Sequence, residues 1–296
     1  MKKKIAAIAA ALALLAAAGC NNDNNAQTTT TAAAEDTTTT TAADVTEATE
    51  AAEDTEATEA TEATEATEDT EATEATESDE APTEATFVDH DGYESAELDS
   101  YLTVETYIQA KQSWWENKGS FYAQNDPDGG YFFYNMPCTQ EEYDQLTPGT
   151  KVKVTGYKAE WAGEVELIDT TFEIIEGDTF IATAEDVTSL LGTDDLIKHQ
   201  NELVSFKGMT VEAYGEDGAV FNYKWDNSGS EGDDLYFKVS KDGKSYTFTV
   251  ESYLCGADTE VYQAVKALNV GDVIDLEGFL YWYEGANPHI TSVTKA

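Results

Sequence analysis

The stretch "PGTKVKVTGYKAEWAGEVELI", residues 148–168, decides the fold because its spacing of glycines occurs twice in the chain. A second stretch, "VGDVIDLEGFLYWYEGANPHI", covers residues 270–290. The shared glycines recur 122 positions later: Gly149, Gly156 and Gly163 as Gly271, Gly278 and Gly285. Most other identities differ, so the spacing indicates a repeated backbone plan.

Each stretch has the pattern of two strands joined by a turn. Val152 and Val154 alternate with polar residues, which is typical of a half-buried strand, and Ile274 and Leu276 do the same in the second copy. The segments "AEWAGE" and "YWYEGAN" then turn the chain back.

A short helix is predicted before each stretch. "TQEEYDQL" opens with Thr139 and has Glu142 three positions later, which is a capping box. "DTEVYQAVKAL" begins near Asp258 and places apolar residues along one helical face.

Three strands are predicted before each helix. "GSFYAQ" and "YFFYNM" form a hairpin in the first copy, as "LYFKVS" and "SYTFTVE" do around "KDGK" in the second. One further strand precedes each hairpin, "LTVETYIQA" and "LVSFKGMTVEAY".

The resulting order, three strands, a helix and two strands, resembles the OB-fold, a five-stranded barrel with its helix between strands three and four. The resemblance covers about residues 87–176 and 200–296. We therefore expect a mostly β protein with two tandem OB-fold-like barrels, the second preceded by short helices in "AEDVTSLLGTDDLIKHQN". A β-sandwich also uses short strands and glycine turns, but it does not explain a helix at the same place twice.

The N-terminus has the pattern of a secretory signal. Three lysines precede an apolar run that is too short for a permanent membrane span, and small residues lead to Cys20. The ending "AAGC" resembles the lipobox of bacterial lipoproteins, although Ala17 stands where that family prefers Leu. The resemblance implies a lipidated Cys20; an ordinary cleaved signal is the alternative.

The segment that follows has almost no apolar residues larger than Ala and repeats a Thr-Glu-Ala triplet from about Thr46. Such a composition predicts an extended, disordered stalk. The expected organisation is a lipoprotein signal peptide at 1–19, the stalk at 20–86, the first barrel at 87–182 and the second barrel, with its helical lead-in, at 183–296.

The charge of the chain is strongly one-sided. The formal net charge is −43, and all 16 basic residues are lysines. Such a surface repels phosphate backbones, and OB-type binding of single strands needs cations beside its aromatic rings. We therefore expect no nucleic-acid partner.

Aromatic residues gather where OB barrels bind ligands, on strands two and three and in the loops after strands one and four. Aromatic faces stack on sugars or anchor protein partners, although alternate strand residues are expected to be buried. The candidate ligand-binding residues are Trp114, Trp115, Tyr122, Trp161, Trp225, Tyr281, Trp282 and Tyr283.

Other chemistry has little support in the sequence. The acidic turns, which include Asp126 and Asp128, do not match the calcium-binding loop, and three distant histidines do not indicate zinc. No catalytic motif and no cofactor site is recognised, so we expect no enzyme. Cys138 and Cys255 occupy matching places in the two repeats and are expected to be buried thiols; a disulfide between them is the alternative.

The chain is also similar to uncharacterised tandem OB-like lipoproteins of gut-type Gram-positive bacteria, a group with no assigned activity. We expect a binding protein that is lipid-anchored on the outer face of the cytoplasmic membrane or at the cell surface. Its expected partner is a protein or other component of the cell envelope. A carbohydrate-binding module and a spacer without a ligand are the alternatives, and the oligomeric state stays open.

Overall fold

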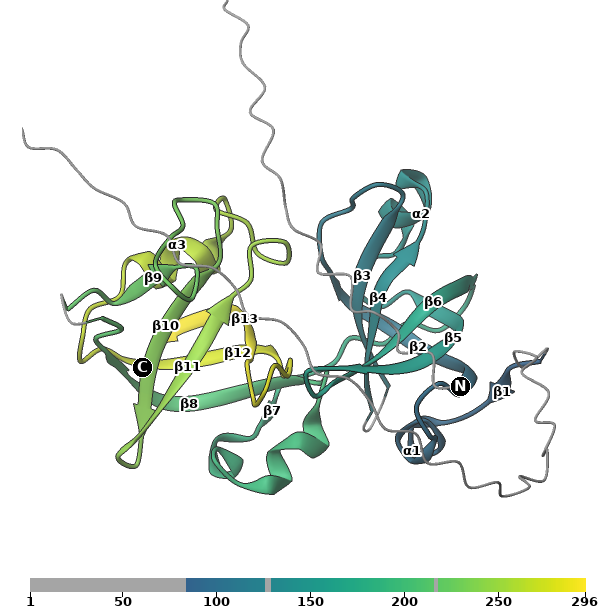
Figure 1. Cartoon of the computed structure of the whole chain (residues 1–296). Coiled ribbons are helices and arrows are strands. Elements are labelled where there is room, and N and C mark those ends of the chain that lie inside the picture. Colours follow the sequence, from purple (N-terminus) through teal and green to yellow (C-terminus); the bar gives the residue numbers. More distant parts are fainter. Residues whose placement is uncertain (1–83, 126–128, 216–217) are drawn as a thin grey trace, which may run out of the picture. The chain divides into compact units, whose positions relative to one another are not determined.

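The computed structural model describes residues 84–125, 129–215 and 218–296 (Figure 1). The predicted signal peptide, Cys20, nearly all of the predicted stalk, Asp126 and Asp128 lie outside the described residues. Within the described ranges, no helix combines the length and apolar character needed to cross a bilayer.

The first barrel is built from five strands that close on themselves. The strands follow the order β2-β3-β4-β6-β5, and β5 pairs back with β2. The elements are β2 (Tyr101–Lys111), β3 (Lys118–Gln124), β4 (Gly130–Pro137), α2 (Gln140–Gln145), β5 (Lys151–Trp161) and β6 (Glu164–Ile175).

The second barrel repeats this plan. Its strands follow the order β8-β12-β13-β11-β10, and β10 pairs back with β8. The elements are β8 (Leu203–Glu212), β9 (Phe221–Tyr223), β10 (Leu235–Lys241), β11 (Lys244–Val250), α3 (Glu260–Lys266), β12 (Val273–Phe279) and β13 (His289–Lys295). The short β9 pairs with the edge of β10.

The two tandem OB-fold-like barrels are confirmed, including the helix between the third and fourth barrel strands. In each barrel the third and fifth strands meet through one parallel pairing, Phe133 with Leu167 and Thr249 with His289. The capping box at Thr139 is also confirmed. The second helix begins one residue later than expected, with Thr259 rather than Asp258 as its N-cap.

The repeated glycines have two physical roles. Gly149 and Gly271 have φ angles of 89° and 91°, a region that favours glycine, and each donates its N–H to the end of the first barrel strand. Gly278 lies instead at a register shift in β12, where a Cβ would stand 2.2 Å from the carbonyl oxygen of His289. The close approach of two backbones excludes a side chain there.

A short strand and a helical segment precede both barrels, whereas the sequence indicated helices only before the second. A short strand pairs in parallel with each first barrel strand and is followed by a helical segment that covers the core. These elements are β1 (Thr86–Phe87) and α1 (His90–Ser95) in the first unit, and β7 (Glu185–Asp186), η1 (Thr188–Leu190) and η2 (Asp194–His199) in the second. Asp89 is the N-cap of α1.

Lys158 holds α1 on the first barrel. Its ammonium group donates to the carbonyl oxygens of Tyr93, Glu94 and Ala96 at 2.8, 2.9 and 2.8 Å. These are carbonyl groups at the C-terminus of the helix, where a cation is stabilised. Burial lowers the pKa of Lys158.

Cys138 and Cys255 are both buried free thiols, as expected, each in the core of its own barrel. Burial raises the pKa of Cys138 to about 11 and that of Cys255 to about 12. Both groups are therefore protonated, unreactive thiols at neutral pH.

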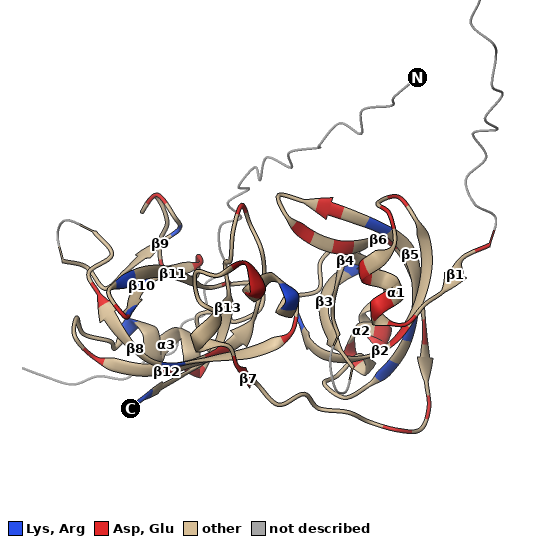
Figure 2. Ribbon diagram, turned by 90° about the horizontal axis from the view of Figure 1, so that it is seen from below, with Lys and Arg blue, Asp and Glu red and all other residues tan. Residues whose placement is uncertain are grey.

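Acidic side chains are spread over strands, helices and loops of the described chain (Figure 2). Several lysines lie in ion pairs, such as Lys151 with Glu105 at 3.1 Å and Lys295 with Asp272 at 2.7 Å. Since acids outnumber lysines in the sequence, most of this acidic surface faces solvent without a lysine beside it.

Candidate functional site

The outer face of β3 and β4, the usual ligand surface of an OB barrel, is covered in the first barrel by the second barrel. Tyr122 and Phe132 form a separate buried cluster with Phe279 of β12. The rings of Tyr122 and Phe279 stack with centroids 4.4 Å apart. We call this contact the barrel junction.

A histidine and a second tyrosine extend the barrel junction. The hydroxyl of Tyr122 lies 3.0 Å from Nδ1 of His289, and the ring of Tyr281 stacks on His289 at 4.4 Å. Burial lowers the pKa of His289 to about 3, so the ring is neutral at physiological pH. Tyr281 also meets Phe132 edge-on at 5.6 Å.

Backbone contacts make the barrel junction close. The N–H of Ser113 donates to the carbonyl oxygen of Tyr253 at 2.7 Å, and the N–H of Leu203 donates to Gln124 Oε1 at 2.9 Å. A Cβ on Gly130 would lie 2.4 Å from the carbonyl carbon of Asn201. The two barrels therefore approach each other closely at these points.

The equivalent loops of the two barrels meet beside the barrel junction. The turn after β5 places Ala162 and Gly163 at φ 53° and 92°, as in a type I′ turn. The N–H of Glu284, in the loop after β12, donates to the carbonyl oxygen of Ala162 at 2.7 Å. Trp161 and Tyr283, which we call the loop pair, lie with ring centroids 5.0 Å apart.

The rings of the loop pair remain accessible to solvent although a hydrogen bond joins the backbones of their loops. Trp161 is 50% exposed and Tyr283 is 46% exposed. Exposed aromatic rings on fixed backbones are typical of anchoring residues in binding surfaces, because little side-chain entropy is lost on contact.

Three carboxyl groups are buried around these aromatic rings. Burial raises the pKa of Glu164 to about 8, although it accepts a hydrogen bond from the N–H of Trp282 at 2.8 Å. Burial likewise raises the pKa of Glu166 to about 7 and, with Asp234 nearby, that of Glu251 to about 7. These groups take up protons near neutral pH.

The structure brings some predicted ligand residues together and separates others. Tyr122 is fully buried at the barrel junction, Tyr281 and Trp282 are half-buried beside it, and Trp161 and Tyr283 form the loop pair. Trp114 is half-buried and donates its indole N–H to the carbonyl oxygen of Cys138 at 3.0 Å.

Two predicted residues are highly exposed and belong to other loops. Trp115, in the loop after β2, is 65% exposed, and Trp225, after β9, is 73% exposed. The structure shows no contact that links either residue to the loop pair within the described chain.

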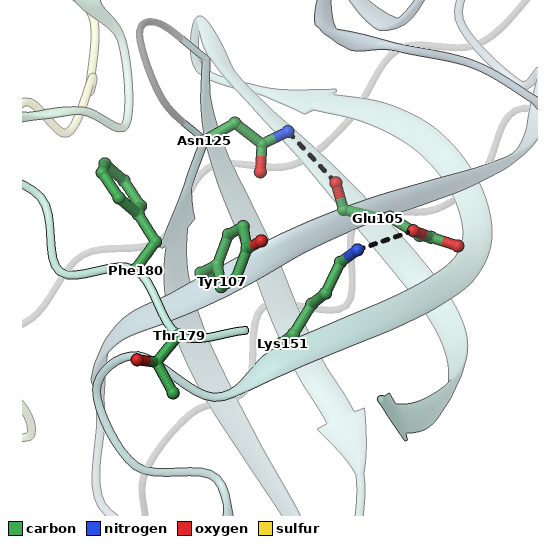
Figure 3. A pocket seen from close by; sticks show the side chains of 6 residues that line it. All are labelled: Glu105, Tyr107, Asn125, Lys151, Thr179 and Phe180. Atoms are coloured by element: carbon green, nitrogen blue, oxygen red, sulfur yellow. Dashed lines mark hydrogen bonds and ion pairs between the residues drawn. The ribbon is translucent and has the colours of Figure 1, made fainter. Parts of the chain in front are cut away.

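A pocket of about 500 Å³ lies on the first barrel (Figure 3). Tyr107 and Phe180 meet edge-on at 5.7 Å, and the ion pair of Lys151 with Glu105 lies beside them. Asn125 donates Nδ2 to the carbonyl oxygen of Glu105 at 3.1 Å, while its Oδ1 has no hydrogen-bond partner among the described residues. Aromatic rings beside polar groups suit a small polar ligand such as a sugar.

Sequence reasoning missed the residues of this pocket and most of the barrel junction. Phe132, Phe279 and His289 follow ordinary strand alternation, which cannot show that a second barrel covers the outer face. Glu164 and Glu166 alternate with apolar residues, a pattern that indicates solvent exposure in an isolated barrel.

No protein-family model matches the chain, and no curated protein is similar to it in sequence. Among solved structures, it is similar to a murine DNA-binding protein bound to double-stranded DNA, with 11% identity, a TM-score of 0.32 and coverage of 66% of this chain and 96% of that chain. It is also similar to a deletion mutant of the single-stranded DNA-binding protein from Thermus aquaticus, with 12% identity, a TM-score of 0.22 and coverage of 66% and 92%.

A third similar structure is a Replication Protein A heterotrimer bound to single-stranded DNA. The identity is 13% and the TM-score 0.27, over 67% of this chain and 52% of that chain. At such identities the likeness is confined to the fold.

These matches contradict one expectation from the sequence. We expected no nucleic-acid partner, whereas the proteins similar in fold are described as binding DNA. The exclusion of nucleic acid was wrong and is withdrawn. The net charge on which it was based describes the whole chain and does not exclude a local binding surface.

Proposed function

We propose that this chain is a lipid-anchored extracytoplasmic binding protein whose two barrels act together as one non-catalytic binding unit. The observation that carries the proposal is the loop pair, because it combines an exposed ring from each barrel on backbones that hydrogen bonds hold together. A surface shared between the barrels exists only when both are present.

A protein of the cell envelope is the proposed partner. Trp161 and Tyr283 are large aromatic rings, each about half-exposed, and the hydrogen bond from the N–H of Glu284 to the carbonyl oxygen of Ala162 joins the loops beside them. Aromatic anchors with a polar rim are the usual centre of a protein interface.

Site-specific photo-crosslinking in cells tests this proposal. A photoreactive phenylalanine analogue replaces Tyr283 in one variant and Trp225, which is more exposed but lies in another loop, in the matched control. We expect a discrete covalent adduct with an envelope protein at position 283 and none at 225. Identical adduct patterns at both positions, or none at 283, would contradict the proposal.

Carbohydrate binding is a second candidate because of the pocket in Figure 3. The face of one of the rings of Tyr107 and Phe180 would stack on a sugar ring, and the nearby Lys151–Glu105 pair would contact its hydroxyl groups. Calorimetric titration with soluble envelope glycans tests it: Tyr107→Ala should abolish the heat of binding, while Trp225→Ala should leave it unchanged. Absence of heat with the unmodified chain across varied glycans would exclude this candidate.

The anchor is a separate part of the proposal and rests on the sequence around Cys20. A diacylglyceryl group with an N-linked chain gives the two signals that stable membrane attachment needs. We expect Cys20→Ala to abolish incorporation of labelled palmitate and to release the chain from the membrane fraction. Retention of label in this variant would show that Cys20 is not the lipidated residue.

A further inference from the structure

Three side chains from different segments of the second barrel's lead-in converge on one point. Glu185 is in β7, His199 ends η2, and Glu202 precedes β8. Nδ1 of His199 lies 2.8 Å from Glu202 Oε2 and 3.8 Å from Glu185 Oε2. All three ligand atoms lie within 4.8 Å of one another.

This arrangement has the spacing of a metal site. Ligand atoms at about 2.0–2.1 Å from a tetrahedral zinc ion stand about 3.3 Å apart, and the two His199 distances bracket that value. A small approach of the exposed Glu185 side chain, together with a slight separation of the His199 ring from Glu202, would bring the three atoms into the geometry of a bound ion.

The three side chains differ in how far they are buried and in how firmly they are held. Glu202 is only 4% exposed, and its Oε1 accepts a hydrogen bond from the N–H of Gly129 at 3.1 Å, which fixes the carboxylate. The side chain of His199 is 20% exposed and that of Glu185 is 58% exposed. The site is therefore held on one side and open to water on the other.

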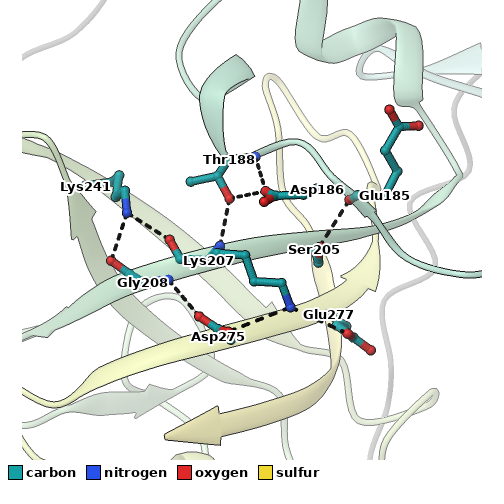
Figure 4. Close-up of polar contacts among 9 residues, drawn as sticks. All are labelled: Glu185, Asp186, Thr188, Ser205, Lys207, Gly208, Lys241, Asp275 and Glu277. Atoms are coloured by element: carbon teal, nitrogen blue, oxygen red, sulfur yellow. Dashed lines mark hydrogen bonds and ion pairs between the residues drawn. The ribbon is translucent and has the colours of Figure 1, made fainter. Parts of the chain in front are cut away.

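The strand that carries Glu185 is anchored on β8. Ser205 donates its hydroxyl to the carbonyl oxygen of Glu185 at 3.3 Å, and the N–H of Lys207 donates to Thr188 Oγ1 at 2.7 Å. Figure 4 shows these contacts and the Glu185 side chain directed away from the ion pairs of Lys207. The Glu185 carboxylate is thus left for His199.

We propose that Glu185, His199 and Glu202 bind a divalent transition-metal ion, with water completing the coordination. One imidazole and two carboxylates suit Zn²⁺, whereas Ca²⁺ and Mg²⁺ prefer oxygen ligands alone.

Binding should also stabilise the fold. The ion would join β7, the end of η2 and the residue before β8. Through its hydrogen bond with Gly129, Glu202 extends this link to the residue before β4 in the first barrel. A ligand that binds only the folded state raises the melting temperature.

Calorimetric titration of the metal-free full chain with Zn²⁺, in the presence of millimolar Ca²⁺ to occupy weak acidic sites, tests the proposal. We expect one Zn²⁺ site and a rise in melting temperature. Glu185→Gln should weaken Zn²⁺ binding by about tenfold or more, and His199→Ala should abolish it together with the rise in melting temperature.

His90→Ala is the matched control, because His90 also lies in a helical segment before a barrel but contacts the carbonyl oxygen of Gly130 rather than paired acids. It should leave Zn²⁺ binding unchanged. Glu185→Gln changes a mostly exposed side chain, so it tests the site even if His199→Ala fails to fold. Unchanged Zn²⁺ affinity in Glu185→Gln, or no Zn²⁺-dependent rise in melting temperature in the unmodified chain, would overturn the proposal.

Discussion

At the scale of single residues, the sequence showed that certain glycines repeat, and the structure shows the backbone angles and contacts that require them. The spacing identified which positions matter, and the turn positions at Gly149 and Gly271 have the positive φ angles that glycine allows. Gly278 differs, because a neighbouring backbone rather than its own φ excludes a side chain.

Gly278→Ala should lower the free energy of unfolding by about 3 kcal/mol, because the new Cβ would stand 2.2 Å from the carbonyl oxygen of His289 and force β12 and β13 apart. Chemical denaturation measures the change. Gly256→Ala, where the nearest atom is 3.3 Å away, is the control and should change stability little. Equal stabilities for the two variants would argue against a tight contact between β12 and β13.

The buried carboxyl groups predict an unusual dependence of stability on pH. The folded pKa of Glu164 is about 8, against an ordinary value of 4.5, so the folded state binds the proton more tightly than the unfolded state. The contribution to stability is fully present below pH 4.5 and is lost as pH rises through 8. Glu166 and Glu251, at about 7, act in the same direction.

The free energy of unfolding should therefore rise by about 3 kcal/mol when pH falls from 8 to 6.5. Glu164→Gln should remove about half of this rise. His289, with a folded pKa of about 3, acts in the opposite direction, and its stabilising contribution is lost as pH falls from its ordinary value of 6.5 toward 3. Denaturation at a series of pH values checks both effects, and a flat profile between pH 8 and 6.5 would refute the assignment.

At the scale of elements, alternation and turn chemistry predicted the five strands and the helix of each barrel. They did not predict the short parallel strands β1 and β7, because two-residue pairings leave no periodic pattern. The helical lead-in was expected only in the second copy. In the first copy the signal was the N-cap Asp89, which accepts the N–H of Gly92 at 2.9 Å.

The hydroxyl group of Thr188 is one of the contacts that hold the lead-in of the second barrel on β8. Thr188 Oγ1 accepts the N–H of Lys207 at 2.7 Å, so Thr188→Val keeps the shape of the side chain but leaves that donor without this partner. We expect a loss of about 1–2 kcal/mol, measured by thermal denaturation. Thr247→Val, at an exposed position of β11, is the control; a matching loss there would show that the effect is not specific to the lead-in.

At the scale of the whole molecule, the sequence indicated two similar barrels but not their contact. Tyr122 and Trp161 were both candidate ligand-binding residues, but alternation alone could not separate a ring that faces solvent from one that faces another barrel. Where two barrels dock depends on the shapes of both surfaces, such as the bare backbone at Gly130 against Asn201, and no local pattern records it.

Gly130→Ala should uncouple the barrels, because its Cβ would lie 2.4 Å from the carbonyl carbon of Asn201. Calorimetry of the unmodified chain should give one cooperative transition for residues 84–296, and the variant should give two. Gly256→Ala should keep one transition. A single transition at an unchanged temperature in Gly130→Ala would mean that the barrels do not depend on this contact.

The covered face of β3 and β4 has a consequence for how such a chain could have arisen by duplication. Tyr122 and Phe132 would lie bare on a solitary first barrel, and a bare apolar sheet surface invites aggregation. An ancestor with one barrel must therefore have had a more hydrophilic surface there, or must have paired with a second copy of itself. The first barrel as it now stands is a poor candidate for expression alone.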